Sequence, residues 1–84
     1  MDDVEEAVIS ATVMVAGVAK DEITPDRPLQ DLRIDSLEFI SLVRAIEEAL
    51  DVTLPDSEAA KAVTIGDLVE TSRRALGRRP GEAR

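Results

Sequence analysis

The sequence lacks several residue types that enzymes and metal sites commonly use. It contains no cysteine, histidine, tryptophan or tyrosine, and Phe39 is its only aromatic residue. The chain can therefore form no disulfide, no thiolate nucleophile and no cysteine-type zinc site, and it lacks the commonest general base. No run of acidic residues has the spacing of a calcium-binding loop. These absences predict a protein that is not an enzyme and that holds no metal.

Long apolar runs and an excess of basic residues are also missing. No apolar run approaches the roughly 18–20 residues that a membrane-spanning helix needs, and the acidic N-terminus lacks the basic start of a secretory signal. The 84 residues carry 18 acidic and 10 basic side chains, a net charge of −8, which argues against nucleic-acid binding. We expect a cytoplasmic protein with one domain over residues 1–76 and a flexible basic tail over residues 77–84.

Apolar residues near the N-terminus recur at the spacing of a helix. Two overlapping pairs of acidic residues at capping-box spacing mark its start without fixing one position, and Gly17 is a suitable C-terminal stop. The pattern predicts a helix over about residues 3–16. Its apolar stripe comprises Val4, Val8, Ala11, Val15 and Val18.

A long connection follows over residues 18–34. Pro25 and Pro28 exclude a regular helix through its middle. A loop of this length is uncommon in a compact domain unless it is functional or pinned by its own side chains. We expect four apolar residues to pin it to the helices, namely Ile23, Leu29, Leu32 and Ile34.

The second predicted helix begins at a clear signal. Asp35 and Glu38 have capping-box spacing, which places Asp35 at the N-cap and Ser36 in the first turn. One face is expected to be core and comprises Phe39, Leu42, Val43, Ile46 and Leu50. The opposite face and its flank form a candidate docking surface that comprises Leu37, Ile40, Ser41, Arg44, Glu47 and Glu48.

The remainder of the chain predicts a short and a longer helix. Residues 51–55 break the second helix, and residues 56–62 allow one or two weakly patterned turns. Thr64, three residues before Asp67, is a suitable cap for a last helix over about residues 65–76. Nothing alternates with period two, so the fold class is an all-α bundle of three longer helices and one short helix.

Ser36 is the residue with the most chemical interest. A hydrolytic nucleophile needs an adjacent base, and only Lys20 or Lys61 could serve, through an unusual arrangement. As an acceptor, its hydroxyl would stand beside free N–H groups at the positive end of a helix dipole, which favours an attached phosphate by about 0.3–1 kcal/mol. The alternative is that a small polar residue simply follows a capping aspartate.

A resemblance to a known family weighs on this choice. The segment Asp31-Leu32-Arg33-Ile34-Asp35-Ser36-Leu37-Glu38-Phe39 resembles the phosphopantetheine attachment region of acyl carrier proteins, whose core is Asp-Ser-Leu. Leu54-Pro55-Asp56 and residues 64–69 follow in the family's order, and the likeness covers about residues 4–76. The resemblance implies a right-handed four-helix bundle with a long loop between helices 1 and 2. It also implies that Ser36 receives 4′-phosphopantetheine from coenzyme A through a separate transferase, and that the prosthetic thiol carries acyl groups as thioesters.

The resemblance can be carried over by position. Asp35, Ser36 and Leu37 match the attachment motif, and Glu38, Glu47 and Glu48 match acidic recognition positions. The chain departs from the family at three positions: Arg33 replaces a usual glycine, Ser41 a common acid and Arg44 a common apolar residue. These departures favour a dedicated carrier in polyketide, lipopeptide or other specialised acyl biosynthesis. The alternatives are a primary fatty-acid carrier, or an acidic helical interaction module with no prosthetic group.

The partners implied are a phosphopantetheinyl transferase, an acyl-loading ligase or acyltransferase, and a ketosynthase, condensation or other acyl-processing enzyme. An acidic surface suits basic patches on such partners, mainly by speeding and orienting the encounter. We expect the carrier to be a monomer.

Overall fold

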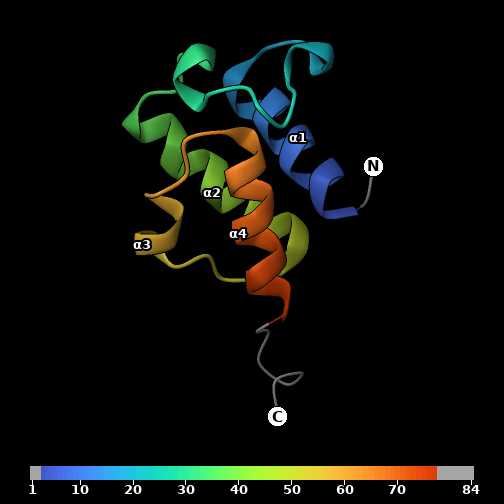
Figure 1. The fold of residues 1–84 in the computed structure, drawn as a ribbon, viewed down its shortest axis with the longest axis vertical. Helices are drawn as coiled ribbons and strands as arrows, with labels where there is room; N and C mark the ends of the chain where they lie inside the picture. The colour runs from blue at the N-terminus through green and yellow to red at the C-terminus, as the bar shows by residue number, and fades with distance from the viewer. Residues whose placement is uncertain (1–2, 78–84) are drawn as a thin grey trace.

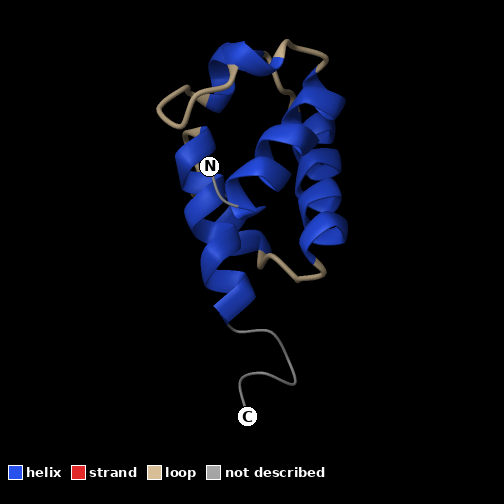
Figure 2. Ribbon diagram, turned by 90° about the vertical axis from the view of Figure 1, so that its right-hand side faces the viewer, coloured by secondary structure: helices blue, strands red, loops and turns tan. Residues whose placement is uncertain are grey.

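The computed structural model describes residues 3–77, and within them it is all-helical. The four α-helices are α1 (Asp3–Ala16), α2 (Ser36–Leu50), α3 (Asp56–Ala59) and α4 (Ile65–Gly77) (Figures 1 and 2). Two short 3₁₀ helices, η1 (Lys20–Glu22) and η2 (Leu29–Leu32), lie in the α1–α2 connection. The predicted fold class of three longer helices and one short helix is confirmed. Apart from Gly77, which ends α4, the predicted tail lies outside the described residues.

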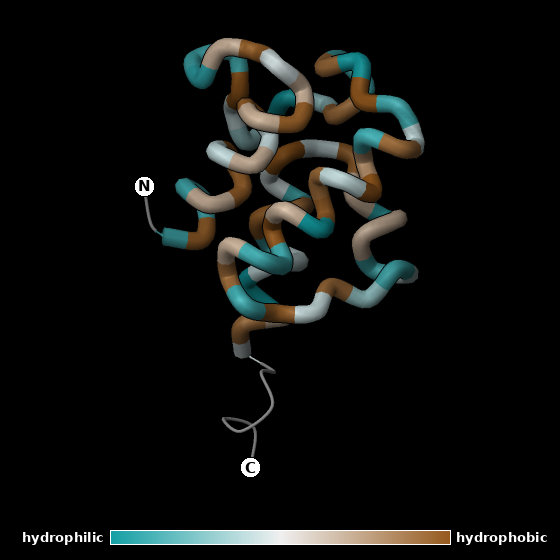
Figure 3. Tube along the Cα trace, turned by 180° about the vertical axis from the view of Figure 1, so that it is seen from behind, coloured by the Kyte–Doolittle hydropathy of each residue, from teal (hydrophilic) through white to brown (hydrophobic). Residues whose placement is uncertain are grey.

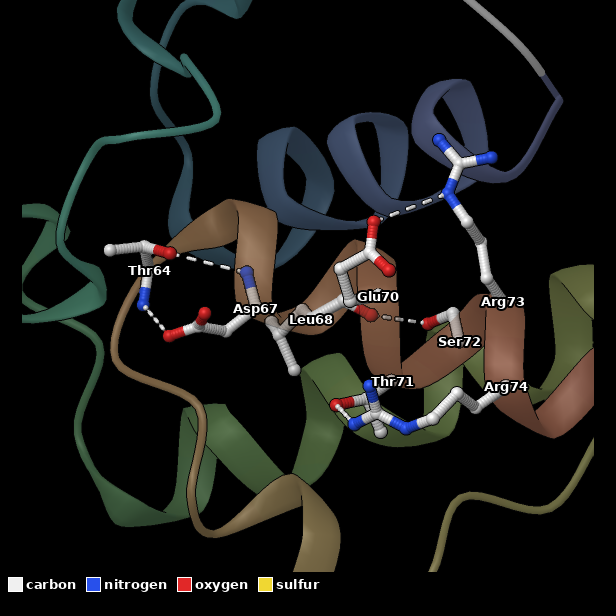
Figure 4. Close-up of polar contacts among 8 residues, drawn as sticks. All are labelled: Thr64, Asp67, Leu68, Glu70, Thr71, Ser72, Arg73 and Arg74. Carbon is white, nitrogen blue, oxygen red and sulfur yellow. Dashed lines mark hydrogen bonds and ion pairs between the residues drawn. The ribbon is translucent and has the colours of Figure 1, made fainter.

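The glycine that ends α1 and the cap that begins α4 act as predicted. Gly17 has φ 70° and donates its N–H to the Val13 carbonyl at 2.9 Å, which ends α1 in the left-handed conformation that glycine favours. At the start of α4, Thr64 and Asp67 bond reciprocally, because each backbone N–H donates to the other's side-chain oxygen at 3.1 Å (Figure 4). These local patterns therefore set the helix boundaries.

The core lies between α1, α2 and α4 and is built from their apolar stripes, which appear as recurring brown stretches in Figure 3. Its fully buried side chains include Val8, Leu42, Ile46, Ile65 and Leu68, all with 0% exposure. The expectation that the whole α2 stripe is core needs correction at Phe39, Val43 and Leu50. These three pack against the core but are only half-buried.

Hydroxyl groups also enter the core, which the sequence analysis did not predict. Thr12 and Ser72 both have 0% exposure. Each donates its hydroxyl to the carbonyl four residues earlier, Thr12 to Val8 at 2.8 Å and Ser72 to Leu68 at 2.7 Å (Figure 4). Burial is tolerated because the hydrogen bond is made within the helix itself.

The α1–α2 connection is anchored as expected and is also hydrogen-bonded to the α3–α4 connection. Ile23, Leu29 and Leu32 are buried, and Ile34 packs against the core. The Leu29 N–H donates to the Val63 carbonyl at 2.8 Å. The N–H groups of residues 65 and 66 donate to the carbonyls of residues 27 and 25, at 3.1 and 2.7 Å. These backbone bonds fix the loop that leads to α2.

Candidate functional site

The start of α2 is held by a complete capping box. The Glu38 N–H donates to Asp35 Oδ1 at 2.8 Å, and the Asp35 N–H donates to Glu38 Oε1 at 3.1 Å. The Phe39 N–H bonds to the Asp35 carbonyl at 2.8 Å, which begins the helical ladder. Ser36 is consequently the first residue of α2, and it is exposed.

Two backbone donors are left beside the Ser36 hydroxyl. The first turn of a helix has N–H groups with no intrahelical partner. The capping box satisfies that of Glu38, whereas those of Ser36 and Leu37 make no hydrogen bond within the described chain. Together with the helix dipole, these donors make the position favourable for an attached phosphate.

Arg33 shapes the approach to this turn. It follows η2 with φ 57° and ψ 37°, the left-handed conformation, and its N–H donates to the Gln30 carbonyl at 3.1 Å. The chain thereby reverses out of η2 and reaches Asp35 in an extended conformation. A residue without Cβ adopts this conformation at no steric cost, which gives a physical reason for the glycine that Arg33 replaces.

Two adjoining hollows extend from Ser36 along α2. The first, of about 550 Å³, is lined by Ser36, Asp35, Ile34 and Leu29 among others. The second, of about 420 Å³, lies between α2 and α3, and its walls include Val43, Ala59 and Arg44. The two share three lining residues, Phe39, Ile40 and Ala60. The half-buried position of Phe39 is explained by its place in both walls.

The outward face of α2 brings together most of the predicted docking residues. Leu37 is 75% exposed and Ile40 57% exposed, and exposed Ser41, Arg44 and Glu48 continue the face along the helix. Leu37 and Ile40 thus place two large apolar side chains in solvent on the side of α2 that faces away from the core.

Glu38 and Glu47 are placed differently from the rest of that set. Both are half-buried. Glu38 takes part in the capping box, and Glu47 Oε2 accepts the Leu54 N–H at 2.8 Å. Glu47 thereby ties the α2–α3 turn to α2, a role that the sequence analysis did not assign to it.

The lysines considered as bases for Ser36 have other surroundings. Lys20 Nζ lies 3.1 Å from Glu6 Oε2, on the α1 side of the molecule. Lys61 lines a polar cleft with Asp67, Glu70 and Arg74, between α3 and α4. The arrangement around Ser36 therefore offers an open hydroxyl and backbone donors, which suit an acceptor of a group more than a self-activated nucleophile.

Two further searches cover only the described residues. Within residues 3–77, no helix is long and apolar enough to cross a membrane. In the same span, no three acidic side chains gather closely enough to hold a metal ion.

Comparison with known proteins finds a match over most of the chain. Residues 6–71 match a family model described as the phosphopantetheine attachment site. An acyl carrier protein of Akkermansia muciniphila is 41% identical over 69 residues, which cover 81% of this chain and 86% of that protein. An acyl carrier protein of Sulfurovum sp. (strain NBC37-1) is 37% identical over 70 residues, covering 82% and 88%. The matched span contains Ser36 and both hollows beside it.

Proposed function

The chain belongs to the acyl carrier protein family, whose prosthetic group is 4′-phosphopantetheine, and from that premise we propose that Ser36 is the attachment residue. The observation that carries the proposal is the exposed hydroxyl of Ser36 at the first position of α2, directly after the capping Asp35. The free N–H groups of Ser36 and Leu37 favour a phosphate there. The prosthetic group supplies the thiol that this cysteine-free chain lacks.

In this function each residue near Ser36 has a limited role. Asp35 caps α2 and holds the hydroxyl at the surface, and Leu37 presents an apolar side chain to a visiting enzyme. The docking face comprises Leu37, Glu38, Ile40, Ser41, Arg44, Glu47 and Glu48. Acyl groups are carried as thioesters between enzymes that dock on this face, so the chain is a substrate of each reaction and catalyses none.

The pathway we propose is polyketide, lipopeptide or other specialised acyl biosynthesis in the cytoplasm. The support is the altered docking face, on which Ser41 and Arg44 stand where the family has a common acid and a common apolar residue. The partners would be a phosphopantetheinyl transferase, an acyl-loading ligase or acyltransferase, and a ketosynthase or condensation enzyme. Mass spectrometry of the thioester on protein from the native host tests the pathway; an ordinary series of saturated chains would instead indicate primary fatty-acid synthesis.

Attachment at Ser36 is tested by incubating the chain with coenzyme A, Mg²⁺ and a broad-specificity phosphopantetheinyl transferase. We expect the intact mass to rise by one phosphopantetheine. Ser36→Ala should abolish the increase, whereas Ser10→Ala, a change at an exposed serine on α1 outside the docking face, should retain it. An increase that persists in Ser36→Ala would place the attachment elsewhere, and no increase in any variant would favour an interaction module without a prosthetic group.

A further inference from the structure

Two of the acidic side chains on the docking face also bond to the backbone of this chain. Glu38 Oε1 accepts the Asp35 N–H at 3.1 Å, and Glu47 Oε2 accepts the Leu54 N–H at 2.8 Å. Both side chains are therefore committed to holding the two ends of α2. Each carboxylate keeps a second oxygen that can accept from a partner, but its backbone hydrogen bond fixes where that oxygen lies.

Arg44 is the basic residue of the docking face. It is exposed and follows Ile40 by four residues, so the two side chains are neighbours on the helix surface. Glu47 and Glu48 lie three and four residues further on, and Asp56 lines the same hollow from α3. Even so, Arg44 makes no ion pair anywhere in residues 3–77.

From this charge pattern we propose that the phosphopantetheinyl transferase that modifies this chain presents a carboxylate to Arg44 and an apolar surface to Leu37 and Ile40. The inference rests on the proposed function, because a transferase acting at Ser36 must dock against the first turns of α2. Arg44 lies about 12 Å from Ser36 along the helix axis, at a rise of about 1.5 Å per residue. A partner footprint of ordinary size covers both.

The sign of the contact can be separated from the charge of the whole chain. The protein carries a net charge of −8, so a purely basic partner would bind better when one more positive charge is removed. If the partner instead places a carboxylate opposite position 44, Arg44→Glu brings two negative charges together at the interface, which opposes association. Arg44→Glu therefore gives opposite results in the two cases.

The test measures kcat/KM for modification by the transferase of the organism that encodes the chain. Arg44→Glu should lower kcat/KM about fivefold at low ionic strength, and the loss should shrink as salt is added. Lys61→Glu makes the same change of net charge on the α3–α4 side and should not lower it. Arg44→Lys should recover most of the wild-type value. All the substituted positions are exposed, and thermal unfolding verifies that each variant is folded.

The outcomes separate this inference from the proposed function. A value of kcat/KM for Arg44→Glu that equals or exceeds the wild-type value, or an equal loss in Lys61→Glu, overturns the contact at Arg44 and leaves Ser36 as the attachment residue. Docking is also read without transfer, by using the Ser36→Ala chain as a competitor of the wild-type reaction. If the Ser36→Ala chain is itself modified while Arg44→Glu still weakens competition, the attachment residue is overturned and the docking contact stands.

Discussion

Arg33 holds a backbone conformation that costs a residue with a side chain about 1–2 kcal/mol relative to the right-handed region. Arg33→Gly removes that cost but adds freedom to the unfolded chain, which offsets roughly half of it. We expect the free energy of unfolding to rise by about 0.5–1 kcal/mol, measured by urea denaturation. Arg33→Ala removes the same charge but keeps Cβ, so an equal gain in Arg33→Ala would show that charge, and not backbone strain, is responsible.

Asp67 predicts a dependence of stability on pH. Its carboxylate accepts the N–H groups of Val63 and Thr64, at 2.8 and 3.1 Å, and these bonds hold the pKa of Asp67 below its ordinary value of 3.8. A folded-state pKa below the unfolded value means that the stabilisation is present above pH 4 and is lost as pH falls through the folded value.

Asp67→Asn tests this dependence by removing the charge and keeping the side-chain size. We expect the variant to unfold at lower urea concentration than the wild type at pH 7. The difference should narrow between pH 4 and the acid limit of folding, because the wild-type carboxylate becomes protonated there. A difference that stays constant with pH would mean that the negative charge of Asp67 contributes nothing.

At the scale of single residues, signals confined to three or four positions could be predicted from the sequence. The Asp35–Glu38 box, the Thr64–Asp67 cap and the Gly17 stop each depend only on adjacent backbone. The bond from Leu54 to Glu47 could not be predicted, because it depends on how the chain turns after α2. The family resemblance therefore predicts Glu47 as a recognition residue and gives no sign of its bond to the backbone.

Among the connecting elements, Gly66 joins α4 to the α1–α2 loop and predicts a clear cost of substitution. Its N–H bonds to the Pro25 carbonyl at 2.7 Å, and a Cβ at this position would lie 2.9 Å from that oxygen. Gly66→Ala must push two backbone segments apart, so we expect a loss of about 1–3 kcal/mol by urea denaturation. Gly77→Ala is the matched control, since a Cβ there meets nothing within 4 Å. Equal stability of the two variants would show that the contact at Gly66 relaxes freely.

The different burial of residues along the apolar face of α2 predicts different costs of truncating them. Leu42 is completely buried, whereas Phe39 is half-buried beside the two hollows. Leu42→Ala should cost about 2–5 kcal/mol, as for a core leucine, and Phe39→Ala about 1–3 kcal/mol, because part of the Phe39 side chain is already exposed. Urea denaturation of both variants checks the order. A larger loss for Phe39 would mean that α2 is rotated about its axis.

For the α1–α2 connection, the apolar anchors could be predicted from the sequence but the backbone hydrogen bonds could not. The sequence predicts its anchoring by Ile23, Leu29 and Leu32, because apolar side chains in a segment that cannot form a regular helix are buried by packing against the helices. The backbone bonds that join residues 25–29 to residues 63–66 carry no side-chain signature. Their partners are more than thirty residues apart in sequence, so only the packed fold brings them together.

For the molecule as a whole, helical periodicity predicted the fold class, since each long helix must bury one stripe against the others. The charge of the docking face was harder to predict. Counting residues gives an acidic face, but Glu38 and Glu47 also bond to backbone groups, whereas exposed Arg44 makes no ion pair within residues 3–77. Composition gives the number of charged side chains, whereas the fold determines which of them also bond to the backbone.

The net charge of −8 predicts how salt affects the whole fold. Acidic groups gathered on a small domain repel one another more strongly in the folded than in the unfolded state. Raising the ionic strength from about 0.01 M to about 0.15 M shortens the Debye length from about 30 Å to about 8 Å, which screens that repulsion. The Tm measured by circular dichroism should therefore rise by several degrees with sodium chloride. A variant that removes two exposed acids, Asp21→Asn with Glu48→Gln, should rise less over the same range. If the Tm of both proteins rises equally, the effect of salt comes from general solvation and not from repulsion among the carboxylates.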